Sequence, residues 1–156
     1  MRSGDTVRGA AAGLLGGLLA AGAMSLMHTM LADGDRGGGQ STPDDATVKV
    51  AAAATSLVGY RLGQAEKAPA GSVVHFAFGA VVGAVYGAAA EISPMVSRVF
   101  GLPFGAAVWL GAHVVAVPAL GLAESAVRQP AAKEAEEFGL HLVYGTITEL
   151  VRRLLR

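Results

Sequence analysis

The segment GAAAGLLGGLLAAGAMSLMHTMLA, residues 9–32, decides the fold of this chain. Its 24 residues include no charged side chain, and a helix needs about 20 apolar residues to cross the hydrocarbon core of a bilayer. The apolar core of a secretory signal peptide is shorter, at about 7–15 residues. The segment therefore predicts a membrane-spanning helix that remains part of the protein.

Three later segments add to this helix. Residues 71–90 and 102–123 are also uncharged, and the second of them contains Pro118, which a membrane helix tolerates when packed neighbours take up the freed backbone groups. Residues 137–155 have an apolar stripe opposite a polar one at helical spacing. This last pattern fits either a spanning helix whose polar stripe faces a bundle or a helix lying flat at the membrane surface.

The first connection, residues 33–70, is polar and is expected to lie outside the membrane. Thr42, Pro43 and the acids Asp44 and Asp45 have the order of a capped helix start. We therefore expect a short surface helix over about residues 43–62.

Composition excludes several classes of protein. Only 15% of the residues are charged, against about a quarter in a soluble domain, and mean hydropathy is +0.49. Twelve basic and twelve acidic residues give no electrostatic case for nucleic-acid binding. The chain has no cysteine, which excludes disulfides and thiolate chemistry. No catalytic motif is present, so the default interpretation is not an enzyme.

Basic residues near the chain ends predict the orientation. Arg2 and Arg8 precede the first span, and Arg152, Arg153 and Arg156 close the chain. Because cytoplasmic flanks of membrane helices are enriched in lysine and arginine, both termini are expected in the cytoplasm.

Glycines recur at four-residue spacing in the first two spans, where small residues let helices approach closely. We expect these two spans to pack together, or to pack against a second copy, through Gly9, Gly13, Gly17, Gly79, Gly83 and Gly87.

The four histidines of the chain fall in four different apolar segments. With both termini in the cytoplasm, His28, His75 and His141 lie at one depth near the outer membrane surface. Glu124 and Glu137 lie near the same end of the expected bundle. Imidazole and carboxylate ligands suit a divalent metal, whereas a haem would need two facing axial ligands and a wide pocket. The simpler alternative is that each ring satisfies a buried hydrogen bond. The candidate metal ligands are His28, His75, His113, His141, Glu124 and Glu137.

Further polar side chains lie along the same helices, and chains of such groups can relay protons. They are Tyr86, Tyr144, Glu91, Glu149, Arg152 and Arg153. Proton-linked transport or pH sensing is therefore a second alternative. The simpler interpretation is that Glu149 pairs with the two arginines at the inner surface, as residues three and four apart on a helix do.

Three stretches resemble the YagU-like family of small bacterial inner-membrane proteins of unknown function. They are HFAFGAVVGAVYGAAAE at 75–91, GAAVWLGAHVVAVPALGL at 105–122 and EEFGLHLVYGTITELVRRLLR at 136–156. The resemblance implies a bacterial inner-membrane location and a last helix that belongs to the bundle. It implies no reaction, and it does not include His28.

Together these features predict an all-α integral membrane protein, with residues 1–156 forming a single transmembrane domain. The expected architecture is a four-helix bundle with spans at about 9–32, 71–90, 102–123 and 137–155. Its expected role is structural or accessory, with metal binding or proton-linked transport as alternatives. The expected partners are the lipid bilayer and a second copy or another membrane protein.

Overall fold

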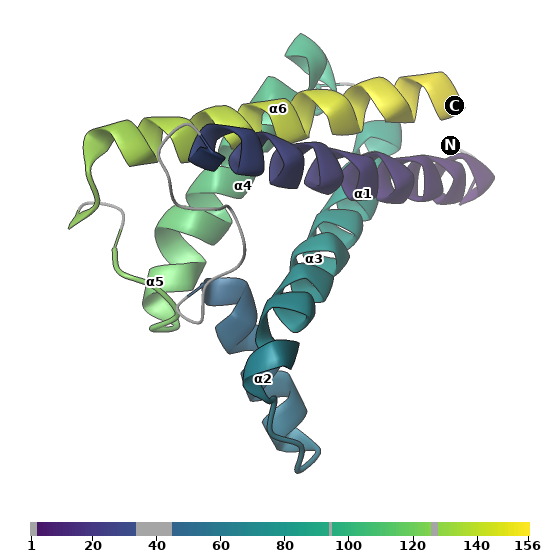
Figure 1. Cartoon of the computed structure of the whole chain (residues 1–156). Helices are drawn as coiled ribbons and strands as arrows, with labels where there is room; N and C mark the ends of the chain where they lie inside the picture. The colour runs from purple at the N-terminus through teal and green to yellow at the C-terminus, as the bar shows by residue number, and fades with distance from the viewer. Residues whose placement is uncertain (1–2, 34–44, 94, 126–127) are drawn as a thin grey trace.

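A computed structural model describes residues 3–33, 45–93, 95–125 and 128–156, and all regular structure within these ranges is helical. The long helices are α1 (Ser3–Asp33), α3 (Gln64–Ile92) and α6 (Ala131–Leu155). Figure 1 shows α1 and α6 running across α3, with both termini at one end of the molecule. This arrangement gives the bundle two distinct ends, which carry different polar groups.

Helices α1 and α3 cross at glycines. A methyl group added to Gly13 would collide with the carbonyl oxygen of Gly83, and one added to Gly17 would collide with that of Gly79. The carbonyl of Gly9 lies equally close to Gly87. Since side chains are absent at these points, the two backbones pack directly on each other, which fixes the angle at which α3 meets the rest of the bundle.

The third apolar segment is not a uniform α-helix. It consists of a short 3-10 turn η1 (Arg98–Gly101), α4 (Leu102–Val108), the π-helical η2 (Trp109–Ala116) and α5 (Val117–Ala119). Pro118 cannot donate a backbone hydrogen bond and its ring crowds the carbonyl four residues earlier, so regular α-helical bonding cannot run through this region. The helix ends at Ala119, before the predicted residue 123, and Gly121 follows with a φ of 68°.

Helix α6 lies between α1 and α4. Gly16 of α1 packs on the backbone of Thr148, and Gly105 of α4 packs on the backbone of His141. Tyr144, Thr148 and Leu140 are buried in these contacts. The helix is therefore part of the bundle and not a separate surface element.

The prediction of four spanning helices is wrong in one respect. Within the described residues, three helices are long and apolar enough to cross a membrane: Gly4–Leu31, Gln64–Ile92 and Arg98–Ala119. The fourth, α6, carries charged residues at both of its ends, including Lys133, Glu134 and Arg153. These charges leave α6 without the stretch of about 20 apolar residues that a spanning helix usually has.

The short helix in the first connection is α2 (Ala46–Leu57). It packs on α3, where Val48 lies against Gly71, and it ends before Gly59, which has a φ of 79°. The predicted helix start at Thr42, Pro43 and Asp44 lies outside the described residues, and the helix stops five residues short of the predicted end at residue 62.

Candidate functional site

A cavity of about 1850 Å³ is lined by residues from the end of the bundle away from the termini. Its walls come from the C-terminal part of α1, the start of α2, the N-terminal part of α3, the segment from η2 to residue 124 and the N-terminal half of α6. We call it the histidine chamber because all four histidines line it. Its histidines and charged residues are His28, His75, His113, His141, Asp45, Glu124, Glu134, Glu136, Glu137, Lys49 and Lys133.

Two histidines pair with glutamates of α6 across this chamber. His28 of α1 lies with its Nε2 atom 2.9 Å from Oε1 of Glu137, and His113 of η2 has its Nε2 atom 3.3 Å from Glu134. The imidazoles stay partly open to the chamber, with side-chain exposures of 44% and 30%, while the glutamates are more buried at 13% and 16%. Each pair therefore presents a titratable ring to the cavity and anchors it on α6.

The other two histidines bond to backbone carbonyls. His141 donates from Nδ1 to the carbonyl of Glu137 at 2.7 Å, and the Nε2 atom of His75 lies 3.3 Å from the carbonyl of Ala21. The rings of His113 and His141 have centroids 6.0 Å apart. His113 and His141 thus form the closest pair of imidazoles described at this site.

Two buried polar atoms beside the chamber have no hydrogen-bond partner within the described part of the chain. They are Nε1 of Trp109 and Oε2 of Glu134. The Trp109 ring stacks on His113 and meets Phe138 edge-on. Buried polar groups are normally paired. Glu134 lines the chamber and its Oε2 atom also lies 3.3 Å from Nε2 of His113, whereas Trp109 belongs to the π-helical segment η2 next to His113. Turns of π-helix occur frequently at functional sites.

The predicted metal ligands do not converge. Among the described residues, no three histidine or acidic side chains lie in a grouping that could hold a metal ion. Glu124 lines the chamber but is exposed, and the carboxylate beside His113 is Glu134, which is not among the predicted ligands. The six predicted residues share a cavity without forming one coordination site among the described residues.

The lining of the chamber is acidic. Five carboxylates face two lysines, so the formal charge is −3 while the histidines are neutral. Lys49 donates to the carbonyl of Leu122 at 2.7 Å, which ties α2 to the segment after α5. Phe78 and Tyr144 add aromatic surface. The chamber therefore offers negative charge and aromatic rings together.

The opposite end of α6 carries a different set, which we call the arginine cluster: Tyr86, Glu91, Glu149, Arg152, Arg153 and Arg156. Glu149 is fully buried and accepts hydrogen bonds from Arg152, Arg153 and Tyr86. Arg152 is 2% exposed and also reaches Glu91 at 2.9 Å. The predicted pairing of Glu149 with Arg152 and Arg153 is confirmed, and the glutamate and Arg152 are buried among the helices. Tyr86 and Glu91 of α3 complete their hydrogen bonds.

Tyr144 takes no part in either pairing. Its hydroxyl donates to the carbonyl of Gly79 at 2.6 Å, at the point where α3 lacks a side chain. The bond ties α6 to the glycine crossing between the two ends.

Sequence reasoning missed Glu134, Glu136, Asp45 and the two lysines as parts of the chamber. Glu134, Glu137 and His141 are three and four residues apart, a spacing that places them on one face of a helix. That signal was available in the sequence. The partners of this face on α1 and η2 depend on the packing of the whole bundle.

Comparisons with known proteins place the chain in a family without assigning an activity. No curated protein and no solved structure matches it. A family model matches residues 46–150, which include α2, α3, the segment from η1 to α5 and most of α6. The chain belongs to the DUF1440 family, a family of proteins of unknown function.

Proposed function

We propose that this protein is an integral membrane protein that binds a small organic cation in the histidine chamber. The observation that carries the proposal is the excess of carboxylates over lysines around one large cavity. Organic cations are held by carboxylates and by aromatic faces together, and both line this cavity.

A membrane location is supported by the three apolar helices and by the apolar side chains on their outer faces. Leu19, Val81 and Leu110 are each more than half exposed, which in water would be unfavourable over so large an area. The resemblance to YagU-like proteins supports a bacterial inner membrane. The arginines gathered near both termini favour cytoplasmic termini. This topology requires α6 to return through the bundle beside the three apolar helices, which agrees with both termini lying at one end of the molecule (Figure 1), and the chamber then opens on the outer side.

An organic cation fits the chamber better than a metal ion does. A metal site needs several ligands within about 2–2.6 Å of one point, and no three potential ligands are grouped in the described residues. Delocalised charge on a larger ion needs no such convergence. The chamber volume of about 1850 Å³ leaves room for a molecule with several carbon atoms.

Protonation should oppose this binding. Histidine is the side chain whose charge ordinarily changes between pH 5 and 8. Each histidine that gains a proton adds one positive charge to a lining whose formal charge is −3 with neutral imidazoles. Because this added positive charge repels a cation, acidification should release the bound cation, and protons should replace it. Binding would then depend on pH.

Isothermal titration calorimetry on protein in a non-ionic detergent tests the proposal. Benzyltrimethylammonium is the cationic probe, and benzenesulfonate is an anion of similar size. At pH 8 we expect saturable heat with the cation and none with the anion. The double variant Glu134→Gln/Glu137→Gln should weaken binding about tenfold or more, since each lost charge contributes about 1 kcal/mol or more at short range.

A matched control is Asp5→Asn, which removes one carboxylate from the first turn of α1 at the other end of the molecule. It should leave the affinity unchanged. Equal heats for cation and anion, or equal losses in the chamber and control variants, would overturn the proposal. Binding of neither probe by a folded protein would also reject it and favour a structural role.

A further inference from the structure

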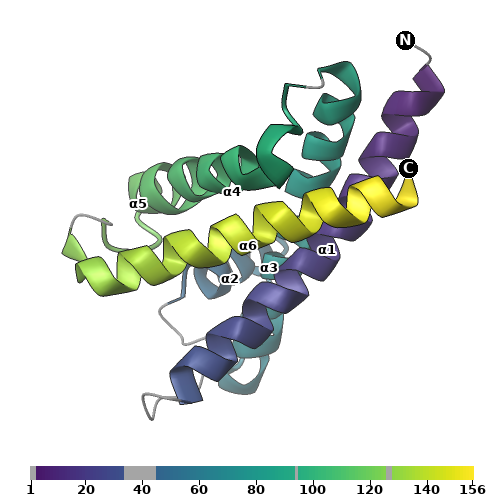
Figure 2. The ribbon, with the colours of Figure 1, turned by 90° about the horizontal axis from the view of Figure 1, so that it is seen from above.

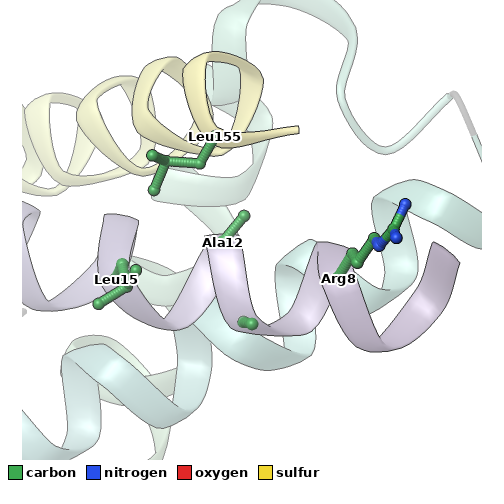
Figure 3. Close-up of a pocket in the computed structure, with 5 residues that line it drawn as sticks. Arg8, Ala12, Leu15 and Leu155 are labelled. Carbon is green, nitrogen blue, oxygen red and sulfur yellow. The ribbon is translucent and has the colours of Figure 1, made fainter. Parts of the chain in front are cut away.

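A second, smaller hollow lies at the termini end, on the outside of the bundle. It has a volume of about 300 Å³ and is lined by Arg8, Ala11, Ala12, Leu15 and Leu155. Figure 3 shows Leu155 of α6 above the turn of α1 that carries Ala12, with Arg8 one turn nearer the N-terminus. We call it the Arg8 groove. It is separate from the histidine chamber and shares no residue with it.

The groove results from the way α1 and α6 cross. The two helices touch where Gly16 packs on Thr148, and Figure 2 shows them diverging on either side of their crossing. Toward the termini the widening gap is bordered by alanines, whose side chains are too short to fill it. The walls are apolar along their whole length except at Arg8.

Arg8 differs from the three arginines of the arginine cluster. Arg152, Arg153 and Arg156 form ion pairs with Glu149 or Glu91. Arg8 is exposed, and within the described residues no ion pair is found for it. Its guanidinium is therefore available to a group from outside the chain.

The position of Arg8 along α1 places this charge near a membrane surface. It lies four residues inside the candidate span Gly4–Leu31, a rise of about 6 Å along a helix. An arginine at that depth can extend its side chain to the headgroup layer. Guanidinium groups bind phosphate through two parallel hydrogen bonds.

Charge at this end selects the kind of lipid. The described charged side chains near the termini are Arg8, Arg98, Arg152, Arg153, Arg156, Asp5, Glu91 and Glu149, which leave a formal charge of +2. Basic surfaces beside a membrane attract anionic lipids, by about 1 kcal/mol per residue. A zwitterionic headgroup gains less from the same field.

We propose that the Arg8 groove binds one anionic phospholipid, with its phosphate on Arg8 and one acyl chain along Ala11, Ala12, Leu15 and Leu155. The lipid would fill the widening gap between α1 and α6. This inference does not depend on cation binding in the histidine chamber.

Native mass spectrometry of the detergent-solubilised protein tests it with two lipids of identical acyl chains, phosphatidylglycerol and phosphatidylcholine. We expect one phosphatidylglycerol to remain bound in preference to phosphatidylcholine. Arg8→Gln should abolish that preference, whereas Ala11→Leu, which fills the groove from its exposed side, should reduce binding of both lipids. Arg61→Gln removes an exposed arginine from the loop after α2 and should change neither.

A preference for phosphatidylglycerol that survives in Arg8→Gln would overturn the proposal, and so would an equal loss in Arg61→Gln. A protein dimer that Ala11→Leu dissociates would show that a second copy occupies the groove. Far-ultraviolet circular dichroism of each variant checks that the helices remain folded, so that lost binding can be assigned to the groove.

Discussion

The two ends of α6 use similar residues in opposite ways. At the arginine cluster, both oxygens of Glu149 accept hydrogen bonds, and Tyr86, Arg152 and Arg153 supply them. At the histidine chamber, Oε2 of Glu134 makes no hydrogen bond within the described residues and lies 3.3 Å from Nε2 of His113 as an ion pair. The buried carboxylate of the arginine cluster therefore accepts hydrogen bonds on both oxygens, whereas the histidine chamber is open and its Glu134 carboxylate is less completely hydrogen-bonded.

This difference separates structure from function along a single helix. A buried charge is tolerated only when its partners surround it. We therefore interpret the arginine cluster as a structural contact that holds α3 and α6 together. Incompletely satisfied groups at the wall of a cavity leave bonding capacity for another molecule. The contrast predicts that substitutions at the first end unfold the protein, while substitutions at the second end spare the fold and change binding.

The largest effect is expected from Arg152→Ala. It leaves Glu149 buried with part of its compensating charge removed, which typically costs about 3–5 kcal/mol. Thermal unfolding in detergent, followed by circular dichroism, measures the loss. Lys133→Ala at the chamber end is the control and should change stability little. Equal effects of the two variants would remove the distinction between the ends.

Tyr86→Phe should come second. It deletes the hydroxyl that donates to Glu149 at 2.8 Å and leaves a charged acceptor short of one bond, at a cost of about 1.5–3 kcal/mol. The ring itself stays stacked on Phe104, so packing is retained. The same unfolding assay measures the effect. A stability equal to that of the wild type would mean that water reaches Glu149 and replaces the hydroxyl group, which would contradict a dry arginine cluster.

Gly83→Leu should lower stability by about 1–3 kcal/mol, the usual range for an overpacked contact. A side chain there meets the carbonyl of Gly13 and pushes α1 away from α3. Gly111→Ala is the matched control, because a methyl group at Gly111 meets open space. If both variants melted alike, the direct backbone packing of α1 on α3 would be in doubt.

Glu137→Gln should have the smallest effect on the fold, at less than about 1 kcal/mol, because its partner His28 is 44% exposed. The same variant is expected to weaken cation binding. A strong loss of stability in this variant would show that the pair of His28 and Glu137 is structural. It would contradict the proposed difference between the two ends of α6.

Sequence alone predicted much of the helical framework and less of its chemistry. Long uncharged runs located α1 and α3, and the four-residue glycine spacing identified the residues that lie at their crossing. The mixed composition of α6 could not reveal that its polar face is buried, because that depends on which helices cover it. The π-helical turn of η2 left no spacing signal, so the neighbours of Trp109 and His113 followed only from the packing.

Some residues of the histidine chamber could be predicted from the sequence, and others could be identified only from the fold. The histidines and Glu137 stood out as ionisable groups in apolar segments. Glu134 and Asp45 looked like ordinary loop and helix-start acids, and only the fold brings them to one cavity. The third helix also ended earlier than its uncharged run suggested, since apolar composition continues past the point where Gly121 turns the chain.

The pH dependence of cation binding tests the central claim most directly. Calorimetric titration of benzyltrimethylammonium should give a dissociation constant that rises about tenfold or more between pH 8 and pH 5, as the chamber histidines gain charge. In the double variant His28→Gln/His113→Gln this rise should be much smaller. An affinity that is the same at both pH values, or stronger at pH 5, would contradict the account.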